Sequence, residues 1–348
     1  MTEIHSPHRS ASSKYTLKIL FISKGKSSAS TRYRASQFFS RFADAGIETL
    51  HVKASGNLRA YIRTLHVAYS ADVVIVLRKT FPAPYLWLLR KASRKLVFDF
   101  DDAIFCNTDG TPSKTRMKRF AAMVSVCDHV LAGNQFLANK AALFNKATTI
   151  IPTCVDASKY LENQAKPADH IELVWIGSSS TRKYLVEALP ALRLAASRVA
   201  NLHLKIIADF DLPGAGLPVR ASLWSSDTEA RELGAAHIGI APMRDDNDWT
   251  RGKCALKVLQ YMAAGLPVIS SNCGANAEII ADRENGFLVS REEDWGDRIL
   301  ELASDPLLRE KLGTAGRKTV STHYDIGPIF QRLLLVITSL SKKNPATG

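Results

Sequence analysis

The sequence predicts an α/β protein built from two Rossmann-like, doubly wound domains that face a cleft. Short apolar runs rich in β-branched residues alternate with amphipathic segments over residues 15–150, and the same alternation begins again at residue 171. Strands that are apolar on both faces and alternate with helices are typical of a parallel sheet covered by helices on both sides. The length of 348 residues allows two such domains, each with a core of its own.

The first domain is expected over residues 15–150. Its predicted strands are the runs "LKILFIS", "IETLHV", "DVVIVL", "KLVFDF", "DHVLAG" and "TTIIP". The amphipathic stretch "RYRASQFFSRFADAG" predicts a helix that ends at Gly46, because glycine is common just past a helix end. Residues 1–14 are polar and lack the apolar core of a signal peptide, so we expect a disordered tail there.

The second domain is expected over residues 171–324, after a polar, irregular linker at residues 151–170. Its predicted elements are, in order, "IELVWIGSS", a helix around 181–199, "LHLKIIAD", "VRASLWS", "AHIGIAP", a helix over 252–264 and "LPVISSN". A further helix is expected in residues 325–348, where it can pack back on the first domain. Ligands of doubly wound domains bind at the carboxyl ends of the strands, so functional side chains are expected there.

The composition excludes several classes of protein. The sequence has no run of about 18 apolar residues, the length that indicates a membrane span. The five cysteines are scattered and never spaced as Cys-x-x-Cys, and the nine histidines show no metal-ligand spacing. We therefore expect neither a disulfide framework nor a metal site, and a reducing, cytoplasmic location.

The net charge of +13 is concentrated in the first domain. Residues 1–150 contain 23 Lys and Arg against 9 Asp and Glu, whereas the rest of the chain is close to neutral. Such a surplus is either a solvated basic face or a surface for an acidic partner, namely a phosphorylated substrate, an anionic membrane or a nucleic acid. No recognition motif for DNA or RNA accompanies it, so no nucleic-acid partner is expected.

The stretch "RGKCALKVLQYMAAGLPVISSNCGANAEII", residues 251–280, is the most informative part of the sequence. Lys253, Lys257 and Gln260 are three and four positions apart, so they share one face near the start of the predicted helix. Cations at this position oppose the helix dipole unless an anion binds beside them. The helix start and the turn at 272–276 offer backbone N–H groups that suit a diphosphate.

Several motifs of the chain resemble the GT-B glycosyltransferases, specifically the retaining family 4 type. "KVLQYMAAGLPVI", "GANAEII" and "NGFLV" are similar to the donor-binding segment of that family. "WIGSSSTRKYL" resembles the first strand, loop and helix of its C-terminal domain, and "AGNQFLANKA" and "IPTCVD" resemble the end of its N-terminal domain and the linker. "ASTRYRASQFFSRFADAGIE" resembles its first loop and helix, so the motifs follow the family's order over most of residues 18–290.

The resemblance implies a hexosyltransferase-like enzyme that moves a sugar from a nucleotide-sugar donor to an acceptor with retention of configuration. The donor would be a UDP- or GDP-sugar held by the C-terminal domain. The acceptor, a glycan that is lipid-linked or phosphorylated, would lie on the basic N-terminal domain, as in cell-envelope polysaccharide synthesis. The resemblance also implies that no metal and no cofactor is needed.

The residues implied for this chemistry fall into two groups. Departure of a nucleoside diphosphate needs positive charge at the β-phosphate, which Lys257 would supply with help from Lys253 or Arg251. The donor itself would be held by the second group, which consists of Gly177, Ser178, Ser179, Arg182, Gln260, Gly274, Asn276 and Glu278.

The sequence departs from the family pattern at one position. The family commonly carries two glutamates eight positions apart; the second matches Gln260 and the first matches Gly252. Glutamine can still hydrogen-bond a ribose hydroxyl, but glycine cannot contact the sugar through a side chain. A degenerate GT-B protein that binds a ligand without turnover is therefore the alternative from another functional class.

The loop "SKGKSSASTRYR", residues 23–34, follows the first predicted strand. It ends in the Gly-Lys-Ser of a P-loop, but the first glycine of that motif is replaced by Leu20, which excludes a P-loop. In a GT-B fold this loop faces the cleft. Gly25, Ser28, Arg32 and Arg34 are therefore predicted to bind a diphosphate leaving group or a phosphorylated acceptor.

The stretch "KLVFDFDDAIF" leaves three interpretations open. Asp99 and Asp101 resemble the first motif of haloacid-dehalogenase-type phosphatases, although about 95 residues precede it here and Ala103 replaces a Thr or Val. The same residues resemble the metal-binding Asp-x-Asp of GT-A glycosyltransferases. In the third interpretation, which we favour, Asp101 and Asp102 orient an acceptor hydroxyl at the end of a strand.

A basic outer face is predicted on the N-terminal domain. The run "PAPYLWLLRKASRKL" combines aromatic side chains with cations, a composition found on helices that lie on anionic lipid. Peripheral binding to the inner face of the plasma membrane would then depend on a set of cations that consists of Arg90, Lys91, Arg94, Lys95, Lys114, Arg116, Lys118 and Arg119.

Overall fold

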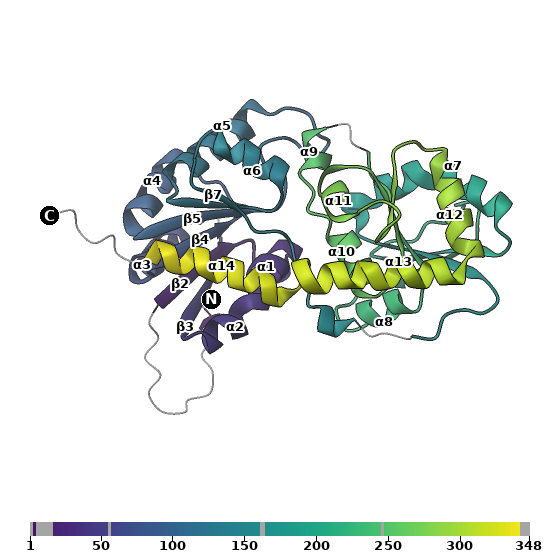
Figure 1. Cartoon of the computed structure of the whole chain (residues 1–348). Helices are drawn as coiled ribbons and strands as arrows, with labels where there is room; N and C mark the ends of the chain where they lie inside the picture. Colours follow the sequence, from purple (N-terminus) through teal and green to yellow (C-terminus); the bar gives the residue numbers. More distant parts are fainter. Residues whose placement is uncertain (1–2, 5–16, 55–56, 161–163, 245–246, 342–348) are drawn as a thin grey trace. The chain divides into compact units, whose positions relative to one another are not determined.

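The computed structural model describes residues 3–4, 17–54, 57–160, 164–244 and 247–341, and it divides into two compact units (Figure 1). Unit 1 consists of Met1–Thr153, Gly252–Cys254 and Ile326–Gly348, and unit 2 consists of Cys154–Arg251 and Ala255–Asp325. The tail expected at residues 1–14 lies outside the described residues except for Glu3–Ile4, which form the short strand β1.

Unit 1 is built on one sheet with the strand order β1-β3-β2-β4-β5-β6-β7. Its strands after β1 are β2 (Leu17–Ser23), β3 (Ile47–Lys53), β4 (Val73–Leu77), β5 (Lys95–Phe100), β6 (His129–Ala132) and β7 (Thr148–Ile150). All of these pair in parallel, while β1 pairs antiparallel with β3. The central strands β2, β4 and β5 are almost wholly buried, which explains their near-continuous apolar sequences.

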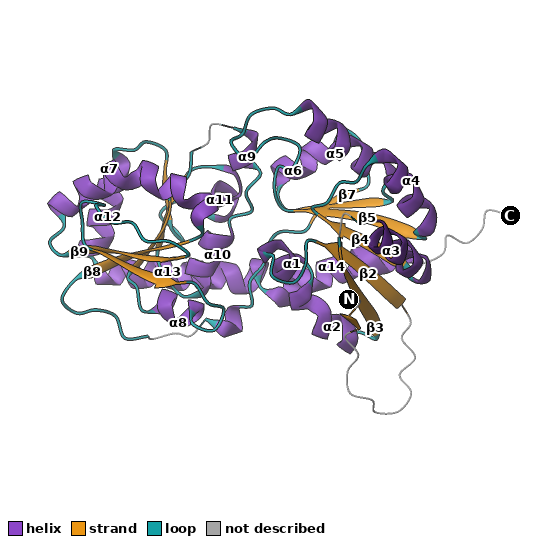
Figure 2. Ribbon diagram, turned by 180° about the vertical axis from the view of Figure 1, so that it is seen from behind, coloured by secondary structure: helices purple, strands orange, loops and turns teal. Residues whose placement is uncertain are grey.

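Helices cover both faces of this sheet (Figure 2). One face carries α1 (Ala29–Arg34), α2 (Phe39–Asp44) and α14 (Ile326–Ser341), and the other carries α3 (Leu58–Ser70), α4 (Ala83–Ala92), α5 (Lys114–Val126) and α6 (Gln135–Ala142). The last helix of the chain thus belongs to unit 1, where the ring of Phe330 lies 5.0 Å from that of Phe42 and 6.1 Å from that of Phe38.

Unit 2 is built on a parallel sheet with the order β10-β9-β8-β11-β12-β13. Its strands are β8 (Ile171–Ile176), β9 (Leu202–Ala208), β10 (Val219–Leu223), β11 (Ile238–Ala241), β12 (Val268–Ser271) and β13 (Phe287–Val289). The strand order reverses between β8 and β11, which is where ligands of doubly wound sheets bind.

The helices of unit 2 also lie on both faces of its sheet (Figure 2). They are α7 (Arg182–Arg198), α8 (Glu229–Gly234), α9 (Asp248–Arg251), α10 (Leu256–Ala263), α11 (Gly274–Ile279), α12 (Asp294–Ser304) and α13 (Pro306–Thr319). Helices α7 and α12 pack against each other on one face, and their apolar residues Leu185, Leu189, Ile299 and Leu302 are part of the core of the unit.

Two sequence expectations differ from the structure. The helix predicted over 252–264 is broken, because Ala255 has a left-handed conformation (φ 55°) and α10 begins only at Leu256. The segment predicted as a polar, irregular linker is irregular in its described parts, 151–160 and 164–170, but it is anchored: the Tyr160 side chain is buried, and its hydroxyl donates a hydrogen bond of 2.7 Å to Glu229. An aromatic anchor inside a polar stretch was not visible from the composition of that stretch.

Candidate functional site

The carboxyl end of β8 holds a lysine above an aromatic ring. Trp175 is completely buried, and its ring lies directly under Gly177, where an added Cβ atom would come within 2.2 Å of it. Glycine is therefore required at position 177 for the ring to occupy this place. The Nζ atom of Lys257 lies 3.7 Å from the centroid of the same ring, a cation–π contact that fixes the ammonium group.

Helix α10 contributes two of the predicted residues. Lys257 is half-buried in its first turn, and Gln260, one turn later, is almost fully buried. Lys253 is not on this helix, because the chain leaves helical geometry before Leu256. The prediction that Lys253, Lys257 and Gln260 share one helical face is therefore wrong for Lys253.

The loop after β8 is held by a carboxylate. Both the backbone N–H and the hydroxyl of Ser179 donate hydrogen bonds of 2.6 Å to Asp209, which follows β9. These bonds lower the pKa of the Asp209 carboxyl. Ser178 closes the same loop by a capping box with Thr181. Asp209 thus occupies the polar groups of Ser179 that the sequence assigned to a phosphate.

The other predicted donor residues lie around α11 and at the start of α7. Gly274 has a positive φ of 48° and faces the Arg251 carbonyl, 3.0 Å from where a Cβ would stand, so only glycine fits without strain. Asn276 is buried and donates to the Ser270 hydroxyl at 2.8 Å. Its role in the structure is thus to tie α11 to β12.

Three exposed side chains remain among the predicted residues of unit 2. Arg182 lies at the start of α7 with its guanidinium over the ring of Phe210, at 5.5 Å. Arg251 is the last residue of α9, and Glu278 lies on α11. All three are exposed to solvent in unit 2.

The carboxyl edge of the sheet in unit 1 carries a network of paired charges. Arg78, directly after β4, has a left-handed conformation (φ 50°) and contacts both Asp101, at 3.2 Å, and Asp102. Burial alone would lower the pKa of the Arg78 guanidinium, but the two carboxylates raise it above its ordinary value. Lys253 completes the network with an ion pair of 2.8 Å to Asp102.

The segment Gly252–Cys254 belongs to unit 1 because it packs tightly onto that network. A Cβ atom on Gly252 would lie 2.7 Å from the Cβ of Ala103 and 2.8 Å from its backbone nitrogen. Asn134 donates a hydrogen bond of 3.0 Å to the Lys253 carbonyl. The glycine that replaces the first family glutamate is thus explained by close packing, which leaves no room for a longer side chain.

The loop after β2 is stabilised from within. Gly25 has a φ of 117°, which favours glycine, and its N–H donates to the Ser23 hydroxyl at 3.1 Å. Ser23 also hydrogen-bonds His51 at 2.8 Å and accepts from Thr31 at 2.9 Å. Ser28 precedes α1 without a side-chain capping bond in the described part of the chain.

Two arginines of this loop have different environments. Arg34 is 3% exposed and forms a bidentate pair with Asp99, with distances of 2.8 and 2.9 Å. Burial would lower the pKa of Arg34, but Asp99 raises it above its ordinary value, so the guanidinium stays charged. The prediction that Arg34 binds a phosphate is therefore wrong, whereas Arg32 is half-buried near the surface.

The positive potential at this edge is visible in the environment of Lys24. Burial, together with the neighbouring Arg78 and Lys79, lowers the pKa of the Lys24 ammonium group. Cations that depress one another's pKa are stabilised when an anion binds between them. Lys24, Arg78 and Lys79 thus form a group of neighbouring cations at the edge of unit 1, in which Arg78 is also paired with Asp101 and Asp102.

The predicted basic outer face is only partly free of acidic partners. Arg90 pairs with Asp128 at 3.3 Å, and Arg94 pairs with Asp72 at 2.9 Å. Lys91 on α4 is exposed, as are Lys114, Arg116, Lys118 and Arg119 on α5, while Lys95 is half-buried. Trp87 is 61% exposed on α4, beside these cations. Of the residues that the structure describes, none forms a helix long and apolar enough to cross a membrane.

The site contains residues that the sequence analysis missed. Arg78 follows a predicted strand, Asp209 ends one, and Trp175 lies in the last part of β8, so their positions near the carboxyl edges were available as a signal. Their partners could not be found in that way, because each contact joins segments distant in the sequence. Within the described parts of the chain, no three His, Cys, Asp or Glu side chains are arranged to hold a metal ion.

The chain is similar to several known proteins. Residues 170–305 match the family described as Glycosyl transferases group 1. Spore coat protein SA of Bacillus subtilis (strain 168) is 36% identical over 80 residues, which is 22% of this chain and 21% of that protein. Alpha-1,3/1,6-mannosyltransferase ALG2 of Dictyostelium discoideum is 29% identical over 83 residues, 24% of this chain and 20% of that protein. The chain thus aligns with about a fifth of the length of these relatives.

A solved structure extends the likeness to most of the chain. Anabaena Alr3699/HepE in complex with UDP and glucose has a TM-score of 0.69 at 15% sequence identity, covering 93% of this chain and 100% of that one. At this identity the likeness establishes the fold alone. The two-domain α/β fold predicted from the sequence is confirmed: the chain has the GT-B fold of glycosyltransferases, and residues 170–305 match their group 1 family.

Proposed function

We propose that the chain is a glycosyltransferase that takes a sugar from a nucleotide-sugar donor. The observation that carries the proposal is the ammonium group of Lys257, which is fixed 3.7 Å above the Trp175 ring at the carboxyl edge of the unit 2 sheet. This place lies within the segment that matches a glycosyltransferase family. It also lies at the reversal of strand order, where doubly wound domains bind ligands.

The donor is proposed to bind unit 2, with its diphosphate beside Lys257. Departure of a nucleoside diphosphate builds negative charge on the β-phosphate, and a preorganised cation stabilises that charge without reorganisation. A UDP- or GDP-sugar is the proposed donor, and UDP with glucose is what HepE holds in its complex. Arg182 and Arg251, both exposed, are the further cations of unit 2 that we assign to the phosphates.

The acceptor is proposed to bind unit 1, and to be a phosphorylated or lipid-linked glycan. Support comes from the positive edge around Lys24 and Arg78 and from the exposed cations of α5. The same cations and Trp87 would let the protein bind the anionic inner face of a membrane peripherally. A role in cell-envelope polysaccharide synthesis follows from an acceptor of this kind.

The transfer is proposed to retain the anomeric configuration and to need neither metal nor cofactor. Asp99, the residue that a phosphatase would use as nucleophile, is buried and paired with Arg34. Asp101 and Asp102 are paired with Arg78, and they would accept a hydrogen bond from a hydroxyl of the acceptor rather than coordinate a metal ion. This arrangement gives the haloacid-dehalogenase and GT-A interpretations little support.

A thermal-shift panel of UDP-, GDP-, ADP- and dTDP-sugars tests the donor class, because a ligand that binds only the folded state raises the melting temperature. We expect one base to stabilise the protein and the others to have little effect. Stabilisation by none of them would contradict the proposal.

The alternative function, binding without turnover, is favoured by one observation: Gly252 leaves no room for the family's first glutamate. Hydrolysis of the stabilising nucleotide-sugar, measured as release of free sugar, distinguishes the transferase from the non-catalytic binding protein, because only the transferase should release sugar slowly. Binding with no hydrolysis and no transfer to any acceptor would favour the degenerate protein.

A further inference from the structure

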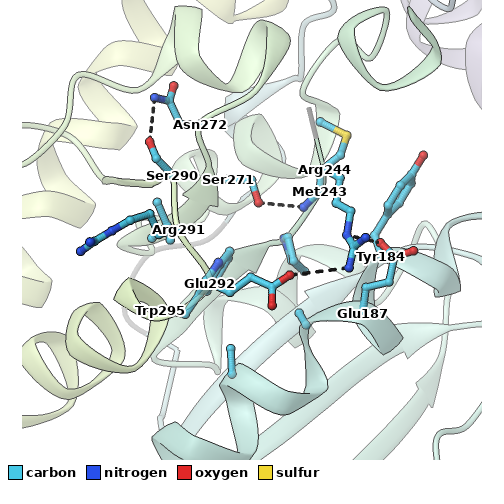
Figure 3. Close-up of a pocket in the computed structure, with 14 residues that line it drawn as sticks. Tyr184, Glu187, Met243, Arg244, Ser271, Asn272, Ser290, Arg291, Glu292 and Trp295 are labelled. Atoms are coloured by element: carbon cyan, nitrogen blue, oxygen red, sulfur yellow. Dashed lines mark hydrogen bonds and ion pairs between the residues drawn. The ribbon is translucent and has the colours of Figure 1, made fainter. Parts of the chain in front are cut away.

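Unit 2 contains a cavity that none of the proposed donor-binding residues lines. Its volume is about 310 Å³, and it lies between α7, α12 and the loops that follow β11, β12 and β13 (Figure 3). This size is at the lower end of the range of roughly 300–1,000 Å³ that is typical of small-molecule sites. The cavity therefore has room for a ligand of its own.

The wall of the cavity combines apolar and aromatic side chains with polar ones. Ala188 and Ala191 of α7 form one side, and the rings of Tyr184 and Trp295 lie at the wall with only 6% and 5% of their surface exposed. Their surroundings hold both rings in place, so they provide a rigid apolar surface. Rigid aromatic surfaces bind the apolar faces of flat or ring-shaped ligands at little cost in conformational entropy.

The rim of the cavity presents hydrogen-bonding groups of both kinds. Arg244 bridges Glu187 of α7, at 3.4 Å, and Glu292, at 3.6 Å (Figure 3). On another side, the Asn272 amide donates a hydrogen bond of 3.1 Å to the Ser290 hydroxyl. The rim thus combines guanidinium and amide donors with carboxylate acceptors, a set that pairs well with neighbouring hydroxyl groups.

The charges of the rim balance one another. Arg244 faces two carboxylates, and Arg291 is paired with Asp294 at 2.6 Å, so both arginines that line the cavity have acidic neighbours. A phosphate or diphosphate would meet Glu187 and Glu292 at the entrance and be repelled. The chemistry of the cavity therefore favours a neutral ligand, in contrast to the donor phosphates.

The bridge of Arg244 is also easy to open. The side chains of Glu187, Arg244 and Glu292 are 39%, 56% and 70% exposed, and exposed ion pairs of this kind contribute little to stability. Hydroxyl groups of a ligand can replace these contacts with little loss.

We propose that this cavity is a binding site for a neutral sugar unit, separate from the site of the donor. The ring of the sugar would pack on Tyr184 and Trp295, and its hydroxyls would exchange for the contacts of Arg244 with the two glutamates. The proposal rests on the cavity itself and does not require that the protein transfers sugars.

Fluorine NMR of the full chain labelled with 5-fluorotryptophan tests the proposal. The chain has five tryptophans, and two of them report on different places: Trp295 on the cavity and Trp175 on the ring beneath Lys257. Each resonance is assigned by a Trp→Phe variant. The probes are the methyl glycosides of glucose, galactose, mannose and N-acetylglucosamine, together with UDP and inorganic phosphate. We expect at least one glycoside to shift the Trp295 resonance in a saturable way and to leave Trp175 unchanged.

Two matched variants test whether the shift of the Trp295 resonance depends on the rim of the cavity. Arg198 also joins α7 to α12, through an ion pair of 2.7 Å with Asp297, but it does not line the cavity. We expect Arg244→Ala to weaken glycoside binding at least tenfold and Arg198→Ala to leave it unchanged. Equal affinities in both variants would place the glycoside elsewhere and overturn the proposal.

Three other results would overturn the proposal as well. The first is the absence of a Trp295 shift with every glycoside. The second is a Trp295 shift caused by inorganic phosphate and not by the glycosides, which would make the cavity an anion site. The third is displacement of the glycoside by UDP, which would make the cavity part of the donor site. A failure of UDP to shift Trp175 would instead count against the proposed function and leave the cavity proposal standing.

Discussion

The carboxyl edges of the two parallel sheets carry different arrangements of charged side chains. In unit 1 the edge is crowded with opposite charges, in which Arg78 contacts Asp101 and Asp102, and Lys253 pairs with Asp102. In unit 2 the Nζ atom of Lys257 lies over the ring of Trp175 near the end of β8. The loop that directly follows β8 carries the hydroxyls of Ser178 and Ser179. Lys257 thus faces the electron-rich face of a ring, whereas Arg78 and Lys253 face carboxylates that offset their charge.

This difference indicates which cations serve a ligand and which serve the fold. Arg34 and Lys257 are both basic residues near the carboxyl end of a central strand, and the sequence analysis assigned both to the site. Arg34 is buried in a bidentate pair with Asp99 and is a structural residue. Lys257 is half-buried and directed to the ring of Trp175. Replacing Arg34 should therefore lower stability, whereas replacing Lys257 should lower turnover.

The largest effect is expected for Arg34→Met. Removing one partner of a buried ion pair leaves the other charge without compensation, which typically costs about 3–5 kcal/mol of stability. We expect a loss of this size in the free energy of unfolding of the variant, measured by urea denaturation. Arg32→Gln, two residues earlier and nearer the surface, is the control and should change stability by no more than about 0.5 kcal/mol.

The double variant Arg34→Met/Asp99→Leu checks the mechanism. Replacing both partners of a buried pair by apolar residues of similar size is often neutral, so much of the lost stability should return. If Arg34→Met were as stable as the wild type and lost only activity, Arg34 would after all belong to the ligand site.

The next effect in size is expected for Lys257→Ala. Loss of one preorganised electrostatic contact to the departing diphosphate should raise the activation barrier by about 2–4 kcal/mol. The melting temperature should change little, because the Lys257 side chain is only half-buried. Lys183→Ala removes another cation that contacts an aromatic ring, that of Tyr184, and should keep its turnover. Near-normal turnover of Lys257→Ala would remove this residue from the proposed mechanism.

The fold could be predicted from the sequence because its signals are local. Buried strands such as β4, "VVIVL", are recognisable from a few consecutive residues, and the second series of strands and helices repeats the pattern of the first. The break before α10 was missed, because the left-handed conformation of Ala255 arises from packing of the preceding segment rather than from a helix-breaking residue. Alanine itself gives no signal for such a break.

The candidate site was predictable in its location but not in its contacts. The sequence placed Asp101 and Asp102 at the end of a strand, where the structure has them, but it could not show that Arg78 neutralises both. It assigned Ser179 to a phosphate and could not show that Asp209, 30 residues later, already accepts its hydrogen bonds. Long-range pairs of this kind depend on tertiary structure, which no local pattern encodes.

A smaller effect is expected for the basic outer face of unit 1. Each Lys or Arg near an anionic membrane contributes roughly 1 kcal/mol, and the attraction fades within a Debye length as salt rises. We expect Lys118→Gln/Arg119→Gln on α5 to weaken binding to anionic vesicles in co-sedimentation at low salt. The matched control, Arg220→Gln/Arg231→Gln, removes two exposed arginines of unit 2 that already contact Glu232 and should have no effect. Equal binding of the wild type to neutral and anionic vesicles, or to neither, would make this surface an ordinary solvated face.

The smallest effect is expected from removal of metal ions. The Asp-x-Asp sequence that a metal-dependent transferase would need occurs in unit 1 at Asp99 and Asp101, and in unit 2 at Asp209 and Asp211. Asp209 already accepts two hydrogen bonds from Ser179. Asp99 is occupied by Arg34 and Asp101 by Arg78, so a divalent cation would have to displace a guanidinium from each carboxylate. In the proposed mechanism the charge of the diphosphate is met by Lys257 instead. Turnover should therefore be the same with and without EDTA. Loss of turnover in EDTA that Mn²⁺ or Mg²⁺ restores would show that a divalent cation, rather than Lys257 alone, meets the charge of the diphosphate.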